Sequence, residues 1–173
     1  MPVANVELNA KGDALRLPII WRLSKLFNVV TNVRRARITE DYGYVILEME
    51  GSTAEVELAK AYLGSLGVCP PATGAPIDSS GPESEIKSPN TIYVRLSTVT
   101  SEQGGVPVLH RIGKDLGVIV NLQRAEFDEE EGGWIEINIS GVLFDVQRSI
   151  AYLHTTGIHV NPRERSVTDF SNL

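Results

Sequence analysis

The chain has 173 residues, 42% of them hydrophobic and 22% charged, a composition typical of folded globular proteins, and its formal net charge is −6. The negative charge argues against nucleic acid and anionic membranes as partners, and the single cysteine, Cys69, excludes a disulfide framework and any multi-cysteine metal site. The start of the chain lacks a secretion-signal pattern and no apolar run is long enough to span a membrane, so we expect a cytoplasmic protein without direct membrane insertion.

Residues 18–68 are repeated at 107–158, with Gly132 as one inserted residue. Most positions that differ exchange one aliphatic residue for another, and the identical ones include Pro18/Pro107, Asn32/Asn121, Gly51/Gly141 and Tyr62/Tyr152. A tandem duplication of this size predicts two small domains, which gain stability when they bury a shared face. We place the domains at 1–69 and 90–162, with a linker rich in proline, glycine and serine at 70–89 and a polar tail at 163–173.

Each half is predicted to fold in the order strand, helix, strand, strand, helix, strand. The first strand covers 3–8 in the first half and 92–96 in the second, where apolar and polar residues alternate. The first helix begins at Pro18 or Pro107, because proline fits the first helical turn. Asn28 and Gly117 follow this helix, at a position where a left-handed residue is expected.

The second strand, at 29–39 and 118–127, has a slip in its apolar alternation. In a regular strand Val29 and Val33 would lie on one face, and Ala36 and Ile38 on the other. Such a slip predicts either a β-bulge or a strand that is buried on both faces at different points. Hairpin turns at 41–43 and 129–133 lead to a third strand with clear alternation, whose inward residues are Val45, Leu47, Met49, Ile135, Ile137 and Ile139.

The second helix follows Gly51 or Gly141 and ends at Gly67 or Gly157, since glycine readily adopts the left-handed conformation that ends helices. Ser52-Thr53-Ala54-Glu55 matches a capping box, which the second copy lacks. A short fourth strand, at 68–69 and 158–160, completes each copy. This order predicts an α+β protein of two ferredoxin-like domains, each an antiparallel sheet with both helices on one face, packed together as an intrachain pseudo-dimer.

Most candidates for catalysis or metal binding fail on their spacing. His110, His154 and His159 do not recur between the halves, and a metal site needs three or four converging ligands. The acidic run at 128–131 lies in a predicted hairpin turn and lacks the alternating spacing of a calcium loop. Gly104-Gly105 precedes a helix, but no phosphate-loop pattern surrounds it. We therefore expect no enzymatic activity, no metal and no other cofactor.

Asn32 and Asn121 are the most informative of the repeated polar residues. Asparagine is disfavoured in strand interiors, yet each lies among aliphatic residues, where an unpaired buried amide would cost about 1–3 kcal/mol. Two interpretations stay open: a structural hydrogen bond to the preceding helix end, or a donor–acceptor pair for the amino and carboxylate groups of a ligand. The repeated basic residues are expected to be solvated or paired with acids: Arg22 and Arg111, Lys25 and Lys114, Arg35 and Arg124.

The first repeat resembles the NIL domain, best known at the C-terminus of the ATPase subunit of bacterial methionine ABC importers. The matching residues are Pro18-Ile19-Ile20, Phe27-Asn28-Val29, Asn32-Val33, Gly51 and Ala61-Tyr62-Leu63. The second repeat carries Pro107-Val108-Leu109, Gly117-Val118, Asn121-Leu122, Gly141 and Ala151-Tyr152-Leu153. The Asn-Ile-Leu signature that names the family reads Asn32-Val33-Arg34 and Asn121-Leu122-Gln123, so its third position departs to a polar residue.

The resemblance implies an ACT-like domain that pairs side by side and binds methionine near the paired interface, so Asn32, Val33, Asn121 and Leu122 inherit a ligand-binding role. The sequence has no Walker motif, so it would be a stand-alone, non-enzymatic regulatory module for methionine or a related sulfur amino acid. The alternative is a protein-interaction or accessory module of sulfur amino acid metabolism or transport that has lost its ligand, for which the polar Arg34 and Gln123 argue.

The expected protein partner in either case is a transporter or a metabolic protein, and a homodimer of the chain is compatible with both. A third interpretation, an accessory subunit of a sulfur-transfer enzyme, rests on Cys69 alone.

Overall fold

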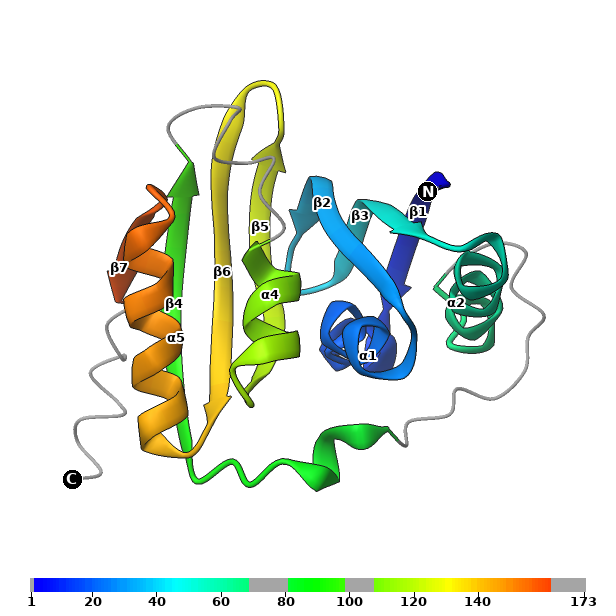
Figure 1. Cartoon of the computed structure of the whole chain (residues 1–173). Helices are drawn as coiled ribbons and strands as arrows, with labels where there is room; N and C mark the ends of the chain where they lie inside the picture. Colours follow the sequence, from blue (N-terminus) through cyan, green and yellow to red (C-terminus); the bar gives the residue numbers. More distant parts are fainter. Residues whose placement is uncertain (1, 69–80, 99–107, 163–173) are drawn as a thin grey trace.

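The computed structural model describes residues 2–68, 81–98 and 108–162 (Figure 1). Within these ranges the chain forms an α+β structure of seven strands, four α-helices and two short 3-10 helices, η1 and η2. Their bounds are β1 Val3–Lys11, η1 Gly12–Arg16, α1 Ile19–Leu26, β2 Val29–Ile38, β3 Tyr42–Gly51, α2 Thr53–Ser65, η2 Pro82–Glu85, β4 Asn90–Thr98, α4 Val108–Asp115, β5 Ile119–Asp128, β6 Gly132–Gly141, α5 Leu143–Thr155 and β7 His159–Pro162.

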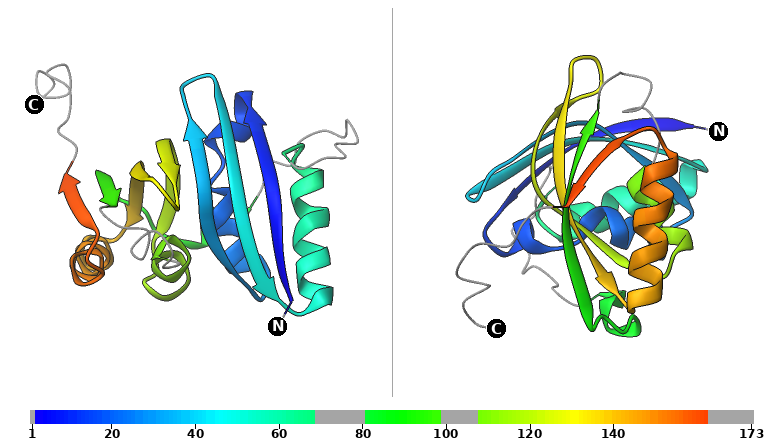
Figure 2. Two further views of the ribbon diagram at one scale, coloured as in Figure 1. Left: turned by 90° about the horizontal axis from the view of Figure 1, so that it is seen from above. Right: turned by 90° about the vertical axis from the view of Figure 1, so that its left-hand side faces the viewer.

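The strands form one antiparallel sheet in the order β1-β3-β2-β5-β6-β4-β7. Figure 2 shows them side by side in this order, with the first repeat supplying three strands and the second repeat four. The two repeats join where β2 pairs with β5, with Arg35 opposite Asp128 and Ile38 opposite Ala125. The helices lie in a row along the sheet, and α1 and α4 are neighbours at the junction (Figure 1).

A β-bulge interrupts β2 between Val33 and Arg35, and another interrupts β5 between Leu122 and Arg124. Of the two explanations for the slip in the apolar pattern, the bulge is therefore confirmed. The extra residue restores the alternation, so that Val33 and Ala36 are both buried. The bulges occupy equivalent positions in the two repeats, at the point where the paired strands β2 and β5 begin to separate.

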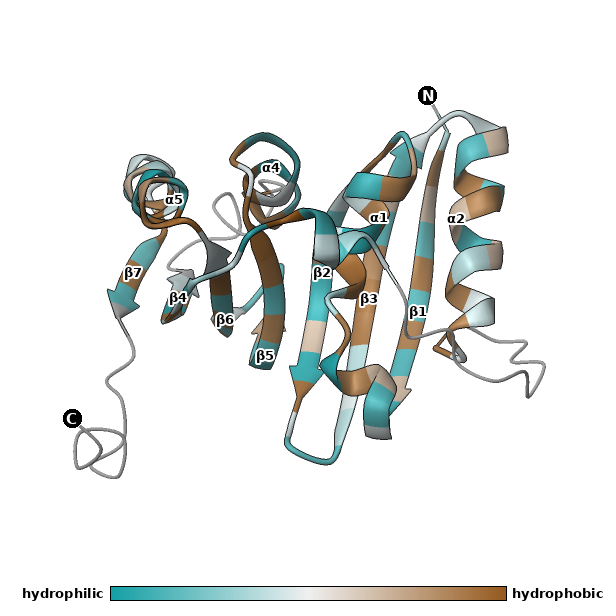
Figure 3. Cartoon of the chain, turned by 90° about the horizontal axis from the view of Figure 1, so that it is seen from below, coloured by the Kyte–Doolittle hydropathy of each residue, from teal (hydrophilic) through white to brown (hydrophobic). Residues whose placement is uncertain are grey.

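One hydrophobic core lies between the sheet and the helices and includes residues of both repeats. Figure 3 shows the hydrophobic residues alternating along the strands beside the helices. All six residues that were predicted to point inward from the third strand of each repeat are buried, namely Val45, Leu47, Met49, Ile135, Ile137 and Ile139. The halves thus share their core across the β2–β5 junction.

Helix ends follow the prediction at three glycines and depart from it at Asn28. Gly67, Gly117 and Gly157 have φ angles of 74°, 70° and 82°, as left-handed helix ends require. In the described ranges no residue other than glycine has a positive φ, so the prediction for Asn28 is wrong. Helix α1 ends instead in an extended Phe27, whose N–H donates to the carbonyl of Leu23 at 3.1 Å, and β2 begins two residues later.

Several boundaries differ from the expected ones. Strand β1 continues to Lys11, and η1 fills most of the connection to α1, which starts one residue after Pro18. The 3-10 helix η2 lies within the expected linker. The carbonyl of Val68 accepts a hydrogen bond from the N–H of Asn9 at 2.8 Å, where the fourth strand of the first repeat was expected. Cys69, Gly104-Gly105, Pro107 and the tail at 163–173 lie outside the described residues.

Candidate functional site

Helices α1 and α4 make close contact at the junction. A Cβ atom added to Gly113 of α4 would lie 2.7 Å from Cδ1 of Trp21 on α1, so glycine permits this approach. The Nζ of Lys25 donates to the carbonyl of Lys114 at 3.3 Å, and the Nζ of Lys114 donates to the carbonyl of Ser24 at 3.4 Å. Each lysine therefore caps the last turn of the helix in the other repeat, where carbonyls lack helical partners.

This reciprocal contact explains why the lysine pair is repeated, and it differs from the expected solvation or pairing with acids. Partial burial lowers the pKa of Lys25, and the nearby charge of Lys114 lowers it further.

Arg22 and Arg111 are repeated in sequence but have different surroundings. Arg22 is only 1% exposed, and its guanidinium donates to Glu83 at 2.5 Å and to the hydroxyl of Tyr62 at 3.2 Å. Arg111 lies exposed on α4. A Cβ atom on Gly81 would lie 2.6 Å from the Arg22 guanidinium, so glycine lets the segment before η2 come close to it. Pairing with an acid is thus confirmed for Arg22.

The third residue of the Asn-Ile-Leu signature has a structural role in the first repeat. Arg34, at the bulge of β2, forms ion pairs with Glu48 of β3 and with Glu129 of the other repeat. Next to it, Arg35 forms an ion pair with Asp128 at 2.7 Å, also across the junction. The polar residue at this position therefore contributes to the contact between the repeats.

A cavity of about 60 Å³ lies at the junction of the two repeats. Its wall is almost entirely apolar and comes from β1, η1, α1, β2, β3 and the connection between η1 and α1 in the first repeat, including Leu15, Trp21 and Gly43. The second repeat contributes Leu109, Val120, Asn121 and Leu122. Asn121 is the one amide side chain among the described residues of this wall, so the cavity combines an apolar surface with a single donor–acceptor group.

Asn121 contacts the opposite repeat. Its Nδ2 donates to the carbonyl of Arg16, at the end of η1, at 3.1 Å. The partner is thus the connection before α1 of the first repeat, not the preceding helix end that the structural interpretation specified. Asn121 and Leu122 both line the cavity at the junction.

Asn32 and Val33 lie elsewhere. Neither is among the described residues that line this cavity. Val33 is buried in the core, and Asn32 is half-buried on β2 opposite Glu48. In the alignment of the repeats, residues 12–16 correspond to 101–105, which lie outside the described part of the chain.

Sequence analysis did not single out Leu15, Trp21 or Gly43. The signal at Gly43 was its repetition as Gly133. A Cβ atom at Gly43 would lie 2.9 Å from Cδ1 of Leu15, so glycine makes room for that side chain. No pattern pointed to Leu15 itself, since it belongs to an irregular connection.

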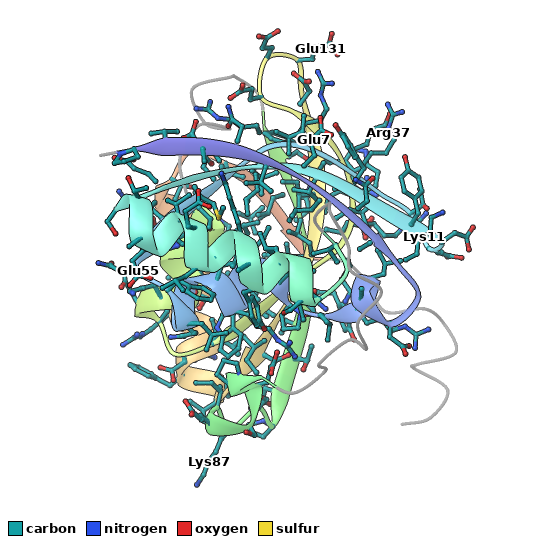
Figure 4. The ribbon with its side chains drawn as sticks, turned by 90° about the vertical axis from the view of Figure 1, so that its right-hand side faces the viewer. Glu7, Lys11, Arg37, Glu55, Lys87 and Glu131 are labelled. Atoms are coloured by element: carbon teal, nitrogen blue, oxygen red, sulfur yellow. The ribbon has the colours of Figure 1, made fainter. Side chains whose placement is uncertain are left out.

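The opposite side of the sheet carries two polar grooves of about 390 and 560 Å³ along β2, β3 and β5. Figure 4 shows Glu7, Arg37 and Glu131 on this side, away from Glu55 on α2. Two arginines of these grooves, Arg34 and Arg35, already form ion pairs, with Glu48 and Asp128 respectively. These grooves therefore suit an apolar ligand less well than the junction cavity does.

The histidines do not converge on one site. His110 is buried on α4, with no hydrogen-bond partner for its Nδ1, and His154 and His159 are exposed. The described residues contain no group of three or more His, Cys, Asp or Glu side chains that could hold a metal ion. In the same ranges no helix is long and apolar enough to cross a membrane.

A family model described as the NIL domain matches residues 4–69 and 94–162. No curated protein matches the chain. Among solved structures, the chain is similar to one described as a microcompartments protein from Desulfitobacterium hafniense DCB, with 13% sequence identity, 100% of each chain covered and a TM-score of 0.32. A likeness at this level carries no argument about fold or function.

Proposed function

Because the chain belongs to the NIL domain family, we propose that it is a small, non-enzymatic regulatory module that binds a small molecule at the junction of its two repeats. The family supports the coarse function, a regulatory or ligand-binding module. The finer proposal is that each repeat is a ferredoxin-like, ACT-like domain and that the two form a pseudo-dimer. The strand order β7-β4-β6-β5 of the second repeat and the side-by-side pairing of β2 with β5 support it.

The junction cavity is the observation that carries the ligand proposal. A site with an apolar wall and one amide suits a ligand with an apolar side chain and a polar head, because an ionised side chain would lose its hydration there without a partner. We propose an amino acid, methionine or a related sulfur amino acid. Asn121 and Leu122 would contact it here, and Asn32 and Val33 would do so in an equivalent second site.

Calorimetric titration with methionine, cysteine and homocysteine tests this function. We expect at least one of them to bind, and we expect Asn121→Ala to weaken binding about 10- to 100-fold, because a hydrogen bond to a charged group contributes about 1.5–3 kcal/mol. The Asn32→Ala, Asn121→Ala double variant should lose binding at both sites. Asn161→Ala, an exposed asparagine on β7, is the matched control. Absence of heat with all three ligands, or unchanged affinity of the double variant, would reject the proposal.

Such a module would work in the cytoplasm beside a transporter or a metabolic protein of sulfur amino acid use, alone or as a homodimer.

One observation favours the alternative, a protein-interaction or accessory module. Leu143 and Phe144 at the start of α5 are 54% and 67% exposed, where the first repeat has Thr53 and Ala54. Exposed apolar side chains next to each other are typical of contact surfaces between proteins. A protein partner that binds the wild type but not Phe144→Ser, with affinity independent of added amino acids, would support this alternative.

A further inference from the structure

We propose that Leu15 and Arg16 of η1 occupy the ligand site as an internal substitute for the ligand, so that an amino acid binds only when η1 moves out. This inference rests on the proposed function and adds its regulation. Leu15 supplies an apolar branched side chain, and Arg16 supplies a carbonyl oxygen to Asn121. An aliphatic amino acid would present the same two features in its side chain and its carboxylate.

The size of the cavity shows that something must move. At about 60 Å³ it is less than half the size of a cavity known to hold a small apolar ligand. An apolar cavity of about 150 Å³ holds benzene, which has fewer heavy atoms than leucine or methionine. The site as it stands is therefore too small for the proposed class of ligand.

The contacts of η1 identify what fills the missing space. Cδ1 of Leu15 would be only 2.9 Å from a Cβ atom on Gly43, so the side chain lies directly against the β3 backbone. Ala14 and Leu17 line the same wall. Removal of η1 would join the volume of these side chains to the cavity and would free the Nδ2 of Asn121 for another acceptor.

The segment η1 is a single short 3-10 helix, whereas most of the wall belongs to strands and α-helices. No side-chain hydrogen bond caps its start, and its first residue, Gly12, has a φ of 61° with nothing within 4 Å of an added Cβ atom. Its end is held by the 3.3 Å hydrogen bond from the N–H of Leu17 to the carbonyl of Ala14. Most of the remaining wall belongs to strands and to the helices α1 and α4, so a local opening at η1 would leave the sheet and these helices in place.

The ligand class follows from what η1 leaves behind. The freed amide of Asn121 can donate to a carboxylate and accept from an ammonium group. The remaining wall is apolar and would take a side chain of about the size of leucine's. Amino acids with uncharged apolar side chains, such as L-leucine and L-methionine, therefore fit, and L-glutamate does not.

Hydrogen exchange of the backbone amides in 12–17 tests the displacement directly on the wild-type chain. If the ligand replaces η1, saturating L-methionine or L-leucine should speed exchange in this segment, whereas L-glutamate should have no effect. Slower exchange in 12–17 on binding would show that the ligand sits beneath an unmoved η1, and would overturn the inference.

The variant Leu15→Ala tests the competition. If the form with η1 in the site is about ten times more populated than the form with η1 moved out, loss of the Leu15 side chain should tighten binding of L-methionine or L-leucine about tenfold. Leu58→Ala, at a leucine that is 56% exposed on α2, is the matched control and should bind as the wild type does. Unchanged or weaker binding by a folded Leu15→Ala would overturn the inference while leaving the proposed function intact, whereas absence of binding by both chains would reject the two together.

Discussion

His110 is a buried titratable residue, one turn before Lys114 on α4, at the position that Trp21 occupies in the first repeat. Burial lowers its pKa most, the charge of Lys114 lowers it further, Asp115 opposes this, and Arg111 has the smallest lowering effect. The unfolded chain, where the pKa is near the usual value of about 6.5, therefore binds the proton more readily than the folded chain does. Stability from the neutral ring is fully present above this pH, and it is lost as the pH falls through the lower folded-state pKa.

We expect the free energy of unfolding to drop more between pH 7.5 and 5.5 in the wild type than in His110→Gln, which cannot take up the proton. Urea denaturation at the two pH values measures this difference. His154→Gln, at an exposed histidine, should keep the pH dependence of the wild type. Equal pH dependence of His110→Gln and the wild type would show that burial of His110 does not affect its titration.

The contact between β2 and β5 depends on charged pairs as well as on the sheet ladder. Arg34 reaches Glu129 of the opposite repeat, and both side chains are one-third exposed. Ion pairs with this exposure contribute about 0.2–1 kcal/mol, because solvent screens them. A double-mutant cycle of Arg34→Ala and Glu129→Ala, read by urea denaturation, should therefore give a small positive coupling. The pair Lys60 and Glu57, within α2, gives the comparison for a pair inside one helix. Zero coupling between Arg34 and Glu129 would mean that this ion pair does not stabilise the junction.

The elements with a clear period, and the helix ends marked by glycine, could be predicted from sequence, whereas the irregular connection before α1 could not. The slip of the apolar pattern marked the place of the bulges but left burial on both faces open, whereas the inward residues of the third strands followed directly from their alternation. The left-handed conformation predicted for Asn28 was wrong because β2 starts directly after this residue, so the chain leaves α1 in an extended conformation. The segment η1 has no period to detect.

The candidate site was only half predictable for the same reason. Asn121 and Leu122 stood out as repeated residues in an apolar strand. The hydrogen bond from Asn121 to Arg16 spans 105 positions, and no local pattern links the two. Leu15 and Trp21 face Asn121 and Leu122 across the cavity only because of the way the repeats pack together, and the sequence pattern of a single repeat does not predict that packing.

The two repeats share one core, so we expect the whole chain to unfold in a single cooperative transition. Each repeat contains one tryptophan, Trp21 or Trp134, so Trp21→Phe and Trp134→Phe leave one fluorescent reporter in either repeat. Urea denaturation followed by fluorescence should give the same midpoint as circular dichroism in each variant. Separate midpoints from the two methods, with Trp21 and Trp134 reporting different transitions, would show that the halves unfold independently.

Because Lys25 of α1 and Lys114 of α4 each cap the other helix, the two repeats depend on each other for their helix ends. Loss of Lys25 leaves its own helix intact and uncaps the helix of the other copy, and the same holds for Lys114 in reverse. A gene duplication usually frees one copy to drift. Here a change in one copy exposes the helix end of the other copy, so both lysines must be kept for both helices to be capped.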